Sequence, residues 1–183
     1  MSETYTVVLL VEQALTAADA AQVRSLHESL DDPDQHVRYV VLLPVEDAAA
    51  RIEAAMGAIG GDTMNAPRMP MDPEAVETVR EESERESSRA LAATLAALRA
   101  AGATAEGRTV DDDPIHALAE TVTEMDGREA IILTRPHVVA EFFHLDWTSK
   151  ARRRLGVPIL HLLEHENFDE QAEGFGEEGV TGL

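Results

Sequence analysis

The chain has 183 residues, of which 35 are acidic and 15 basic, and its formal net charge is -20. That charge repels phosphate polyanions, so the composition argues against binding to nucleic acid or to an anionic membrane surface. The absence of cysteine excludes disulfide scaffolds, thiolate metal sites and cysteine nucleophiles.

The length corresponds to one ordinary α/β domain with a short tail. We expect the domain to span residues 1–163, with a mobile insertion at about 57–71, and the acidic, glycine-containing segment 164–183 to form a flexible tail. Residues 1–12 contain no basic leader, and no apolar run approaches the roughly 18 residues of a membrane span. These features predict a cytoplasmic protein that does not enter the membrane.

The first third of the chain predicts a strand, a helix and a second strand. Residues 5–12 form a continuous apolar run, which is typical of a strand buried on both faces of a parallel sheet. Thr16 and Asp19 can satisfy N–H groups at a helix start, and the apolar spacing that follows predicts about four turns. A β-branched run at 36–43, stopped by Pro44, predicts the second strand.

The middle of the chain predicts a long helix, a weak strand and a shorter helix. Asp72-Pro73 supplies a helix start, and nothing interrupts the helix for about 29 residues, of which only the C-terminal turns need to pack on the sheet. Residues 104–110 form a strand interrupted by Gly107, which places it near a sheet edge or at a bulge. Asp113-Pro114 begins the next helix, and Gly127 is expected to cap its end.

The last elements complete an alternating pattern. Residues 130–134 predict a fourth buried strand, a helix is expected from Asp146 to Leu155, and 157–163 predict a fifth strand. Five strands alternating with helices predict a doubly wound, mostly parallel five-stranded sheet with helices on both faces.

A ligand on such a sheet binds at the carboxyl ends of the strands. The four segments at those ends lack glycine, which a phosphate-binding loop needs for close approach of backbone N–H groups. These segments are 12–15, 44–47, 111–114 and 134–147. The sequence therefore disfavours nucleotide binding through a glycine-rich loop.

Four strand-like sequences follow one another along the chain: VVLLVE, VRYVVLLP, AIILT and GVPILHLL. Asp113-Pro114-Ile115 begins the third helix, and RLGVPIL at 154–160 closes the fold. In this order, residues 5–163 resemble the universal stress protein family. The resemblance implies a Rossmann-like fold of the adenine nucleotide alpha hydrolase type. It also implies a homodimer paired antiparallel along 157–163, a ladder from which Pro158 is expected to remove one N–H group.

The resemblance also indicates where a cofactor would bind. ATP-binding members of the family carry an Asp at the end of the first strand and a Gly-x-x-Gly-x9-Gly-Ser/Thr motif after the fourth. Here Glu12 takes the first position, and bulky residues take the three glycine positions. The candidate cofactor-binding residues are Glu12, Thr134, Arg135, His137, Trp147 and Thr148. These departures predict a non-catalytic, stress-related regulatory protein with no cofactor, in which ATP binding is disfavoured.

Two alternatives remain open at this point. Arg135, with the basic run at 150–154, offers guanidinium groups that hold anions without glycines, so the chain is alternatively a nucleotide- or anion-binding member with an altered pocket. The competing interpretation is a solvated basic helix. An enzyme of unknown reaction is the third reading, although no nucleophile lies in a recognised motif.

Two further groups of side chains were considered as sites. Five histidines lack the spacing of a recognised metal motif, so no metal is expected: His116, His137, His144, His161 and His165. Phe142, Phe143 and Trp147 concentrate aromatic rings beside the expected crevice, which suits a pocket wall, a protein interface or the core.

Overall fold

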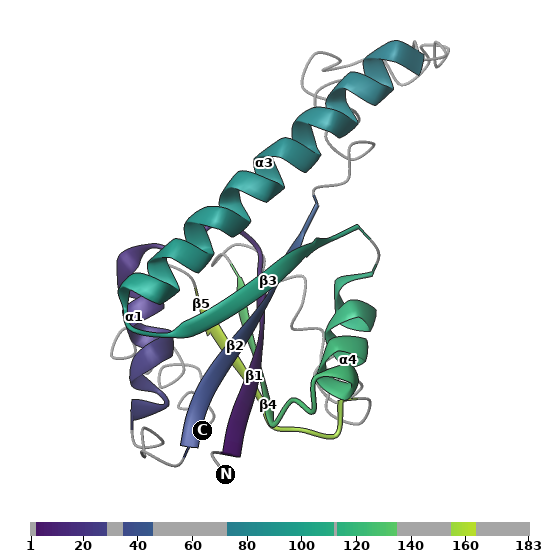
Figure 1. Ribbon diagram of the computed structural model, residues 1–183. Coiled ribbons are helices and arrows are strands. Elements are labelled where there is room, and N and C mark those ends of the chain that lie inside the picture. Colours follow the sequence, from purple (N-terminus) through teal and green to yellow (C-terminus); the bar gives the residue numbers. More distant parts are fainter. Residues whose placement is uncertain (1–2, 29–34, 46–72, 112, 135–154, 164–183) are drawn as a thin grey trace, which may run out of the picture.

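Five parallel strands form one sheet in the order β3-β2-β1-β4-β5, as Figure 1 shows for the computed structural model. The structure describes residues 3–28, 35–45, 73–111, 113–134 and 155–163. The strands are β1 (Glu3–Val11), β2 (Gln35–Pro44), β3 (Thr104–Val110), β4 (Glu129–Thr134) and β5 (Ile159–Leu163). The predicted doubly wound parallel sheet is confirmed.

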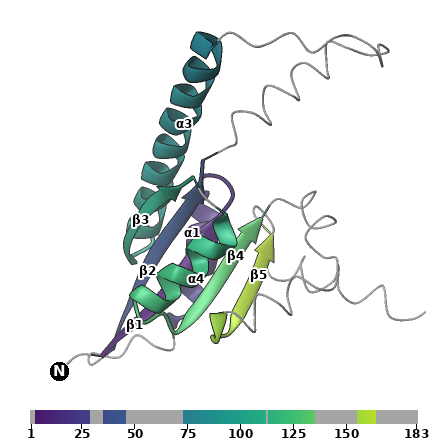
Figure 2. The same ribbon diagram turned by 90° about the vertical axis from the view of Figure 1, so that its right-hand side faces the viewer.

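Helices cover both faces of the sheet. Helices α1 (Ala17–Ser25) and α3 (Pro73–Ala100) lie on one face, and α4 (Pro114–Glu124) lies on the other (Figure 2). Alternate residues of the central strand β1 enter two separate cores, Val7 and Leu9 on the α1 side and Val8 and Leu10 on the α4 side. Burial on both faces explains why the residues from Val7 to Val11 are continuously apolar.

Helix α1 begins as predicted and is shorter than expected. Its capping box is present: the Asp19 N–H donates to Thr16 Oγ1 at 3.2 Å, and the Thr16 N–H donates to Asp19 Oδ2 at 2.9 Å. The helix has 9 residues, about two and a half turns, where four were expected. It ends because the His27 N–H bonds back to the Arg24 carbonyl, three residues earlier, while the His27 side chain enters the α1-side core.

Helix α3 has 28 residues, close to the predicted length, and it extends well beyond the sheet (Figure 1). Its C-terminal turns pack on the sheet through Leu98 and its neighbours. Burial also reaches further toward the N-terminus than predicted, since Ser83 and Ser87 are 1% and 6% exposed. Among the described helices, none is long and apolar enough to cross a membrane.

The ends of α3 and α4 use the same turn with different residues. After α3, Gly102 adopts a φ of +84°, and the Ala103 N–H bonds to the Leu98 carbonyl at 2.9 Å. After α4, the left-handed position is taken by Asp126, with a φ of +48°, and the Gly127 N–H completes the turn. The expectation that Gly127 would take that position is wrong by one residue.

Gly107 lies in β3, which is an edge strand of the described sheet, as predicted. It is needed because of a close approach: a Cβ atom there would lie 2.5 Å from the carbonyl oxygen of Val41, its register partner on β2. The glycine therefore allows β3 to pack against β2.

Strand β5 begins at Ile159, two residues later than expected, because Gly156 turns the chain with a φ of +66°. The Ala130 N–H donates to the Pro158 carbonyl, so the backbone of Pro158 faces β4. Pro158 therefore removes no N–H from the outer edge of β5, contrary to the sequence expectation. Of the predicted helix ending at Leu155, only that last residue is described, and the insertion 57–71 and the tail 164–183 lie outside the described residues.

Candidate functional site

The candidate site lies at the carboxyl ends of β1 and β4. The chain leaves β1 toward β2 on one side, and β4 and β5 extend the sheet on the other side, so the topology switches between β1 and β4. Ligands of doubly wound sheets bind at such a point. The Glu12 N–H donates to the Leu133 carbonyl at 3.2 Å, which keeps Glu12 beside the end of β4, where Thr134 closes the strand.

Two of the six predicted cofactor-binding residues are thus brought together, since Glu12 and Thr134 share this edge. Glu12 is half-buried. The other four lie outside the described residues: Arg135, His137, Trp147 and Thr148. The basic run at 150–154 and the rings of Phe142 and Phe143 also lie outside them.

The loop after β1 is fixed to the long helix. The Leu15 N–H donates to Thr94 Oγ1 of α3 at 3.1 Å, and Thr94 is fully buried. This bond satisfies a buried amide and sets the distance between the loop and α3. Sequence reasoning missed Thr94, although a hydroxyl residue on the apolar face of a helix indicates a specific hydrogen bond.

Two helices that begin at this edge within the described residues, α1 and α4, use side chains to bond some of their own first amides. At α1, Thr16 Oγ1 accepts from the Asp19 N–H. At α4, Asp113 Oδ1 accepts from the Ile115 and His116 N–H groups at 2.9 Å each, as the Asp-Pro motif predicts. Amides at helix N-termini are common phosphate ligands, and these are already bonded to side-chain oxygens.

A second polar cluster lies toward the amino ends of the strands, on the α1 side of the sheet. Within it, His27 Nδ1 lies 3.0 Å from the Tyr39 hydroxyl, and His27 Nε2 lies 3.0 Å from a Glu129 carboxylate oxygen. The Tyr5 hydroxyl donates to the same carboxylate at 3.4 Å. Burial raises the pKa of Tyr5, the negative charge of Glu129 raises it further, and Arg128 opposes the shift.

A hydroxyl, an imidazole and a carboxylate that are linked by hydrogen bonds in this order are also found in the active sites of hydrolases. Here His27 is 3% exposed and Tyr39 is fully buried, so a substrate has no access to either group. The cluster connects the end of α1 to β2 and β4, and it stabilises the folded chain. No local sequence pattern indicates the cluster, because its members lie on three separate strands and in the turn after α1.

Two of the five histidines considered as metal ligands can be placed. His116 is exposed and lies 3.2 Å from Glu120 of the same helix. His161 is half-buried on β5, and burial lowers its pKa. Within the described ranges, no group of three or more His, Asp or Glu side chains is arranged to hold a metal ion. His137, His144 and His165 lie outside those ranges.

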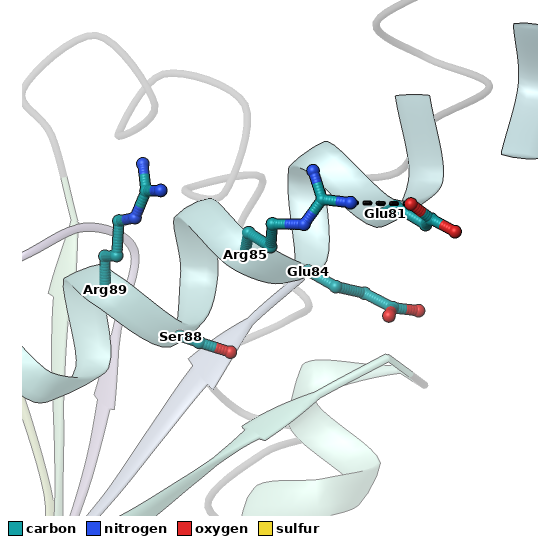
Figure 3. A pocket seen from close by; sticks show the side chains of 5 residues that line it. All are labelled: Glu81, Glu84, Arg85, Ser88 and Arg89. Carbon is teal, nitrogen blue, oxygen red and sulfur yellow. Dashed lines mark hydrogen bonds and ion pairs between the residues drawn. The ribbon is translucent and has the colours of Figure 1, made fainter. Parts of the chain in front are cut away.

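A hollow of about 550 Å³ lies along the exposed part of α3 (Figure 3). Its lining residues come from one helix face: Glu81, Glu84, Arg85, Ser88 and Arg89. Arg85 pairs with Glu81 at 2.6 Å, and Glu84 pairs with Arg80 at 3.1 Å. Because most of its charges neutralise one another, the hollow has little attraction for an ionic cofactor.

Comparison with known proteins shows which solved structures have a similar fold. No family model and no curated protein sequence matches the chain. The universal stress protein UspA from Lactobacillus plantarum is 14% identical, with a TM-score of 0.52 over 88% of this chain and 99% of that one. A universal stress protein from Archaeoglobus fulgidus is 12% identical, with a TM-score of 0.51 over 86% and 92% of the two chains.

A universal stress protein family structure from Arabidopsis thaliana, with AMP bound, is also similar. It is 12% identical to this chain, with a TM-score of 0.50 over 90% of this chain and 94% of that one. At such identities the similarity shows the fold. The predicted resemblance to universal stress proteins is thereby confirmed at the level of the fold.

Proposed function

We propose that the chain is a universal-stress-protein-like regulatory protein that acts by binding and not by catalysis, and that it does not hold ATP. The observation that carries the proposal concerns the two helix starts that the structure describes at the edge where a ligand would bind: Thr16 already accepts from an amide of α1, and Asp113 accepts from two amides of α4. Phosphate sites in doubly wound folds depend on unbonded amides at such helix starts.

Charge and side-chain size support the same conclusion. Asp111 and Asp113 put carboxylates at this edge, and they repel a triphosphate. In the sequence, Trp147 stands where the family's ATP-binding members have a glycine. A large ring at that position opposes close contact between backbone and phosphate.

A nucleotide- or anion-binding protein with an altered pocket is the second candidate. The observation in its favour is the similarity to the Arabidopsis thaliana protein, whose structure holds AMP. In this reading Arg135 supplies the positive charge that the glycine loop lacks, and Glu12 and Thr148 complete the pocket. AMP, with a single phosphate, is easier to accommodate than ATP.

Thermal unfolding measured with increasing ATP, and separately with AMP, tests the two candidates. For the proposed function we expect no saturable increase in melting temperature with ATP. A saturable increase that disappears in Arg135→Ala and persists in Arg89→Ala, a matched exposed arginine of α3, contradicts the proposal and supports the second candidate. AMP binding without ATP binding supports an altered monophosphate pocket.

A variant that restores the family's motif provides a second test. It combines Glu12→Asp with Thr134→Gly, His137→Gly and Trp147→Gly. If bulky side chains prevent phosphate contact, this variant gains ATP-dependent stabilisation that the unmodified chain lacks. Failure to gain it, in a variant whose circular dichroism shows a folded protein, argues against that explanation.

The proposed assembly is a homodimer paired through the strand at 157–163. Support comes from the position of β5 at one edge of the described sheet, where it has β4 as its neighbour on one side. An edge strand offers a row of backbone groups to another strand. Light scattering at high micromolar concentration tests this assembly, and a monomer there contradicts it.

A further inference from the structure

Met125 lies at the end of α4, and its side chain is exposed to solvent. Of the 6 methionines in the chain, it is the one that lies within the described residues. It is 37% exposed, which it shares with Val76 alone among the large apolar side chains that the structure describes. Its N–H donates to the Thr121 carbonyl at 2.9 Å, so the backbone is fixed at the last turn of the helix. An exposed thioether is accessible to a small oxidant in solution.

The sulfur of Met125 faces the side chain of Arg38 on β2. Arg38 Nη2 donates to Met125 Sδ at 3.9 Å. The other terminal nitrogen of the same guanidinium, Nη1, lies 3.5 Å from a Glu106 carboxylate oxygen on β3. Because a thioether sulfur is a weak acceptor, the bond from Nη2 to Met125 uses little of the hydrogen-bonding capacity of Arg38.

The third nitrogen of Arg38 is a buried donor without an acceptor. Within the part of the chain that the structure describes, Arg38 Nε is buried and makes no hydrogen bond. In a planar guanidinium, the Nε–H and one N–H of Nη2 are parallel and form an edge that binds oxygen acceptors. Since Nη2 faces Met125, this edge of Arg38 is turned toward the sulfur. A buried donor without a partner is unfavourable, so an oxygen placed beside the sulfur would be stabilised there.

We propose that Met125 is a redox modification site, at which a peroxide converts the thioether to a sulfoxide and Arg38 binds the added oxygen. The sulfur attacks one oxygen of hydrogen peroxide, so that an S–O bond forms and the O–O bond breaks. The departing hydroxide takes the proton of the transferred oxygen and becomes water. The sulfur is oxidised by two electrons, and the peroxide is reduced by the same two. This inference does not depend on the proposed binding function.

The added oxygen replaces a weak contact by two hydrogen bonds. It is bonded directly to Sδ, so it reaches a distance of about 2.9 Å from both Nε and Nη2 of Arg38. The end of α4 is then joined to β2 more strongly than by the sulfur alone. Oxidation of a methionine in a core disrupts packing because the sulfoxide is polar. At this exposed position the polar product meets hydrogen-bond donors instead.

Oxidation of the full chain with hydrogen peroxide tests the site itself. Peptide mass spectrometry measures the sulfoxide at each methionine separately. We expect Met125 to be oxidised at a rate comparable to that of free methionine in the same solution, because its side chain is exposed. If Met125 stays reduced while the free methionine is oxidised, the modification site is overturned.

Urea denaturation before and after oxidation tests the role of Arg38. Met125→Leu retains the other methionines, so subtracting its response to oxidation isolates the contribution of residue 125. The comparison is made in the parent chain and in Arg38→Lys, which keeps the charge but lacks the planar edge. We expect oxidation of Met125 to raise the unfolding equilibrium constant at least about fivefold more in Arg38→Lys than in the parent chain.

Glu106→Gln is the matched control, because it removes the ion pair of Nη1 and leaves the edge that faces Met125. It is expected to respond to oxidation as the parent chain does. Met125→Gln places an amide oxygen near Arg38 without any oxidant, and we expect its stability to depend on Arg38 in the same direction. Equal responses to oxidation in the parent chain and in Arg38→Lys overturn the binding of the sulfoxide by Arg38, and so does a Met125→Gln chain whose stability is independent of Arg38.

Discussion

The Nδ1 atom of His27 lies 3.0 Å from the hydroxyl oxygen of Tyr39, and both side chains are buried. The Tyr39 hydroxyl also lies 3.5 Å from the carbonyl oxygen of Val23, which belongs to the last turn of α1. Carbonyls of a last helical turn have no partner within the helix. Tyr39 therefore serves two purposes, since it holds the His27 ring and helps to satisfy the end of α1.

Removal of the Tyr39 hydroxyl is expected to destabilise the fold. In Tyr39→Phe the ring still fills its space, but His27 Nδ1 loses its partner inside the core. A buried polar group without a partner costs about 1–3 kcal/mol of unfolding free energy. Urea denaturation measures this loss, and a double-mutant cycle with His27→Leu is expected to show coupling of about 0.5 kcal/mol or more. Additive losses in the cycle contradict the contact.

Tyr5 is expected to make the fold sensitive to alkali. Burial and the nearby Glu129 carboxylate raise the pKa of Tyr5 above 10.0, so the folded chain favours the neutral phenol. The associated stability is complete below the pKa of the unfolded chain and is lost as the pH rises through the higher folded value.

This dependence is measured by phenolate absorbance in Tyr39→Phe, where Tyr5 is the remaining tyrosine, because the chain has 2. We expect a titration midpoint above that of the same variant in denaturant. Glu129→Gln removes a negative charge and lowers the midpoint, whereas Arg128→Ala raises it. A midpoint equal to that in denaturant shows that Tyr5 is not coupled to the fold.

The sheet could be predicted from the sequence because its signals are local. The run at 5–12 predicted β1 (Glu3–Val11), whose residues from Val7 to Val11 are apolar on both faces, and Asp113 followed by Pro114 determines where α4 starts. The short α1 could not be predicted in this way. Its apolar spacing continues past Ser25, and its end depends on partners of His27 that lie 12 and 102 positions away.

Only part of the candidate site could be predicted from the sequence. Glu12 could be placed, because the position after a first parallel strand lies at the ligand edge. Thr94 could not, because its bond to Leu15 joins residues 79 positions apart. The sequence predicted that Thr16 and Asp113 cap their helices. It did not show that both capped starts lie at one edge of the sheet, where their bonded amides matter for phosphate binding.

Gly107 is expected to tolerate no side chain. In Gly107→Ala the new Cβ lies 2.5 Å from the Val41 carbonyl oxygen, so the two strands must separate at a point of backbone contact. Overpacking of this kind costs about 1–3 kcal/mol of unfolding free energy. Thr104→Ala, at an exposed position of the same edge strand, is the control and is expected to change stability by less than about 0.5 kcal/mol. Equal stabilities of the two variants in urea contradict the close approach.

Thr94 is expected to control the loop that carries Glu12. Thr94→Val keeps the shape of the side chain but removes the oxygen that accepts from the Leu15 N–H, which leaves a buried amide without its partner. The expected loss is about 1–3 kcal/mol of unfolding free energy. Amide hydrogen exchange at Leu15 is expected to become faster, because the loop separates from α3 more often.

Thr94→Ser restores the acceptor oxygen and is expected to recover slow exchange at Leu15, although it lacks one methyl group. The matched control is Thr123→Val on α4, where the hydroxyl bonds to the Ala119 carbonyl at an exposed position. Its removal there leaves no amide unsatisfied and is expected to leave Leu15 exchange unchanged. If Thr94→Ser and Thr94→Val exchange equally fast at Leu15, the hydroxyl does not fix the loop, and the position of Glu12 must depend on its backbone bond to Leu133.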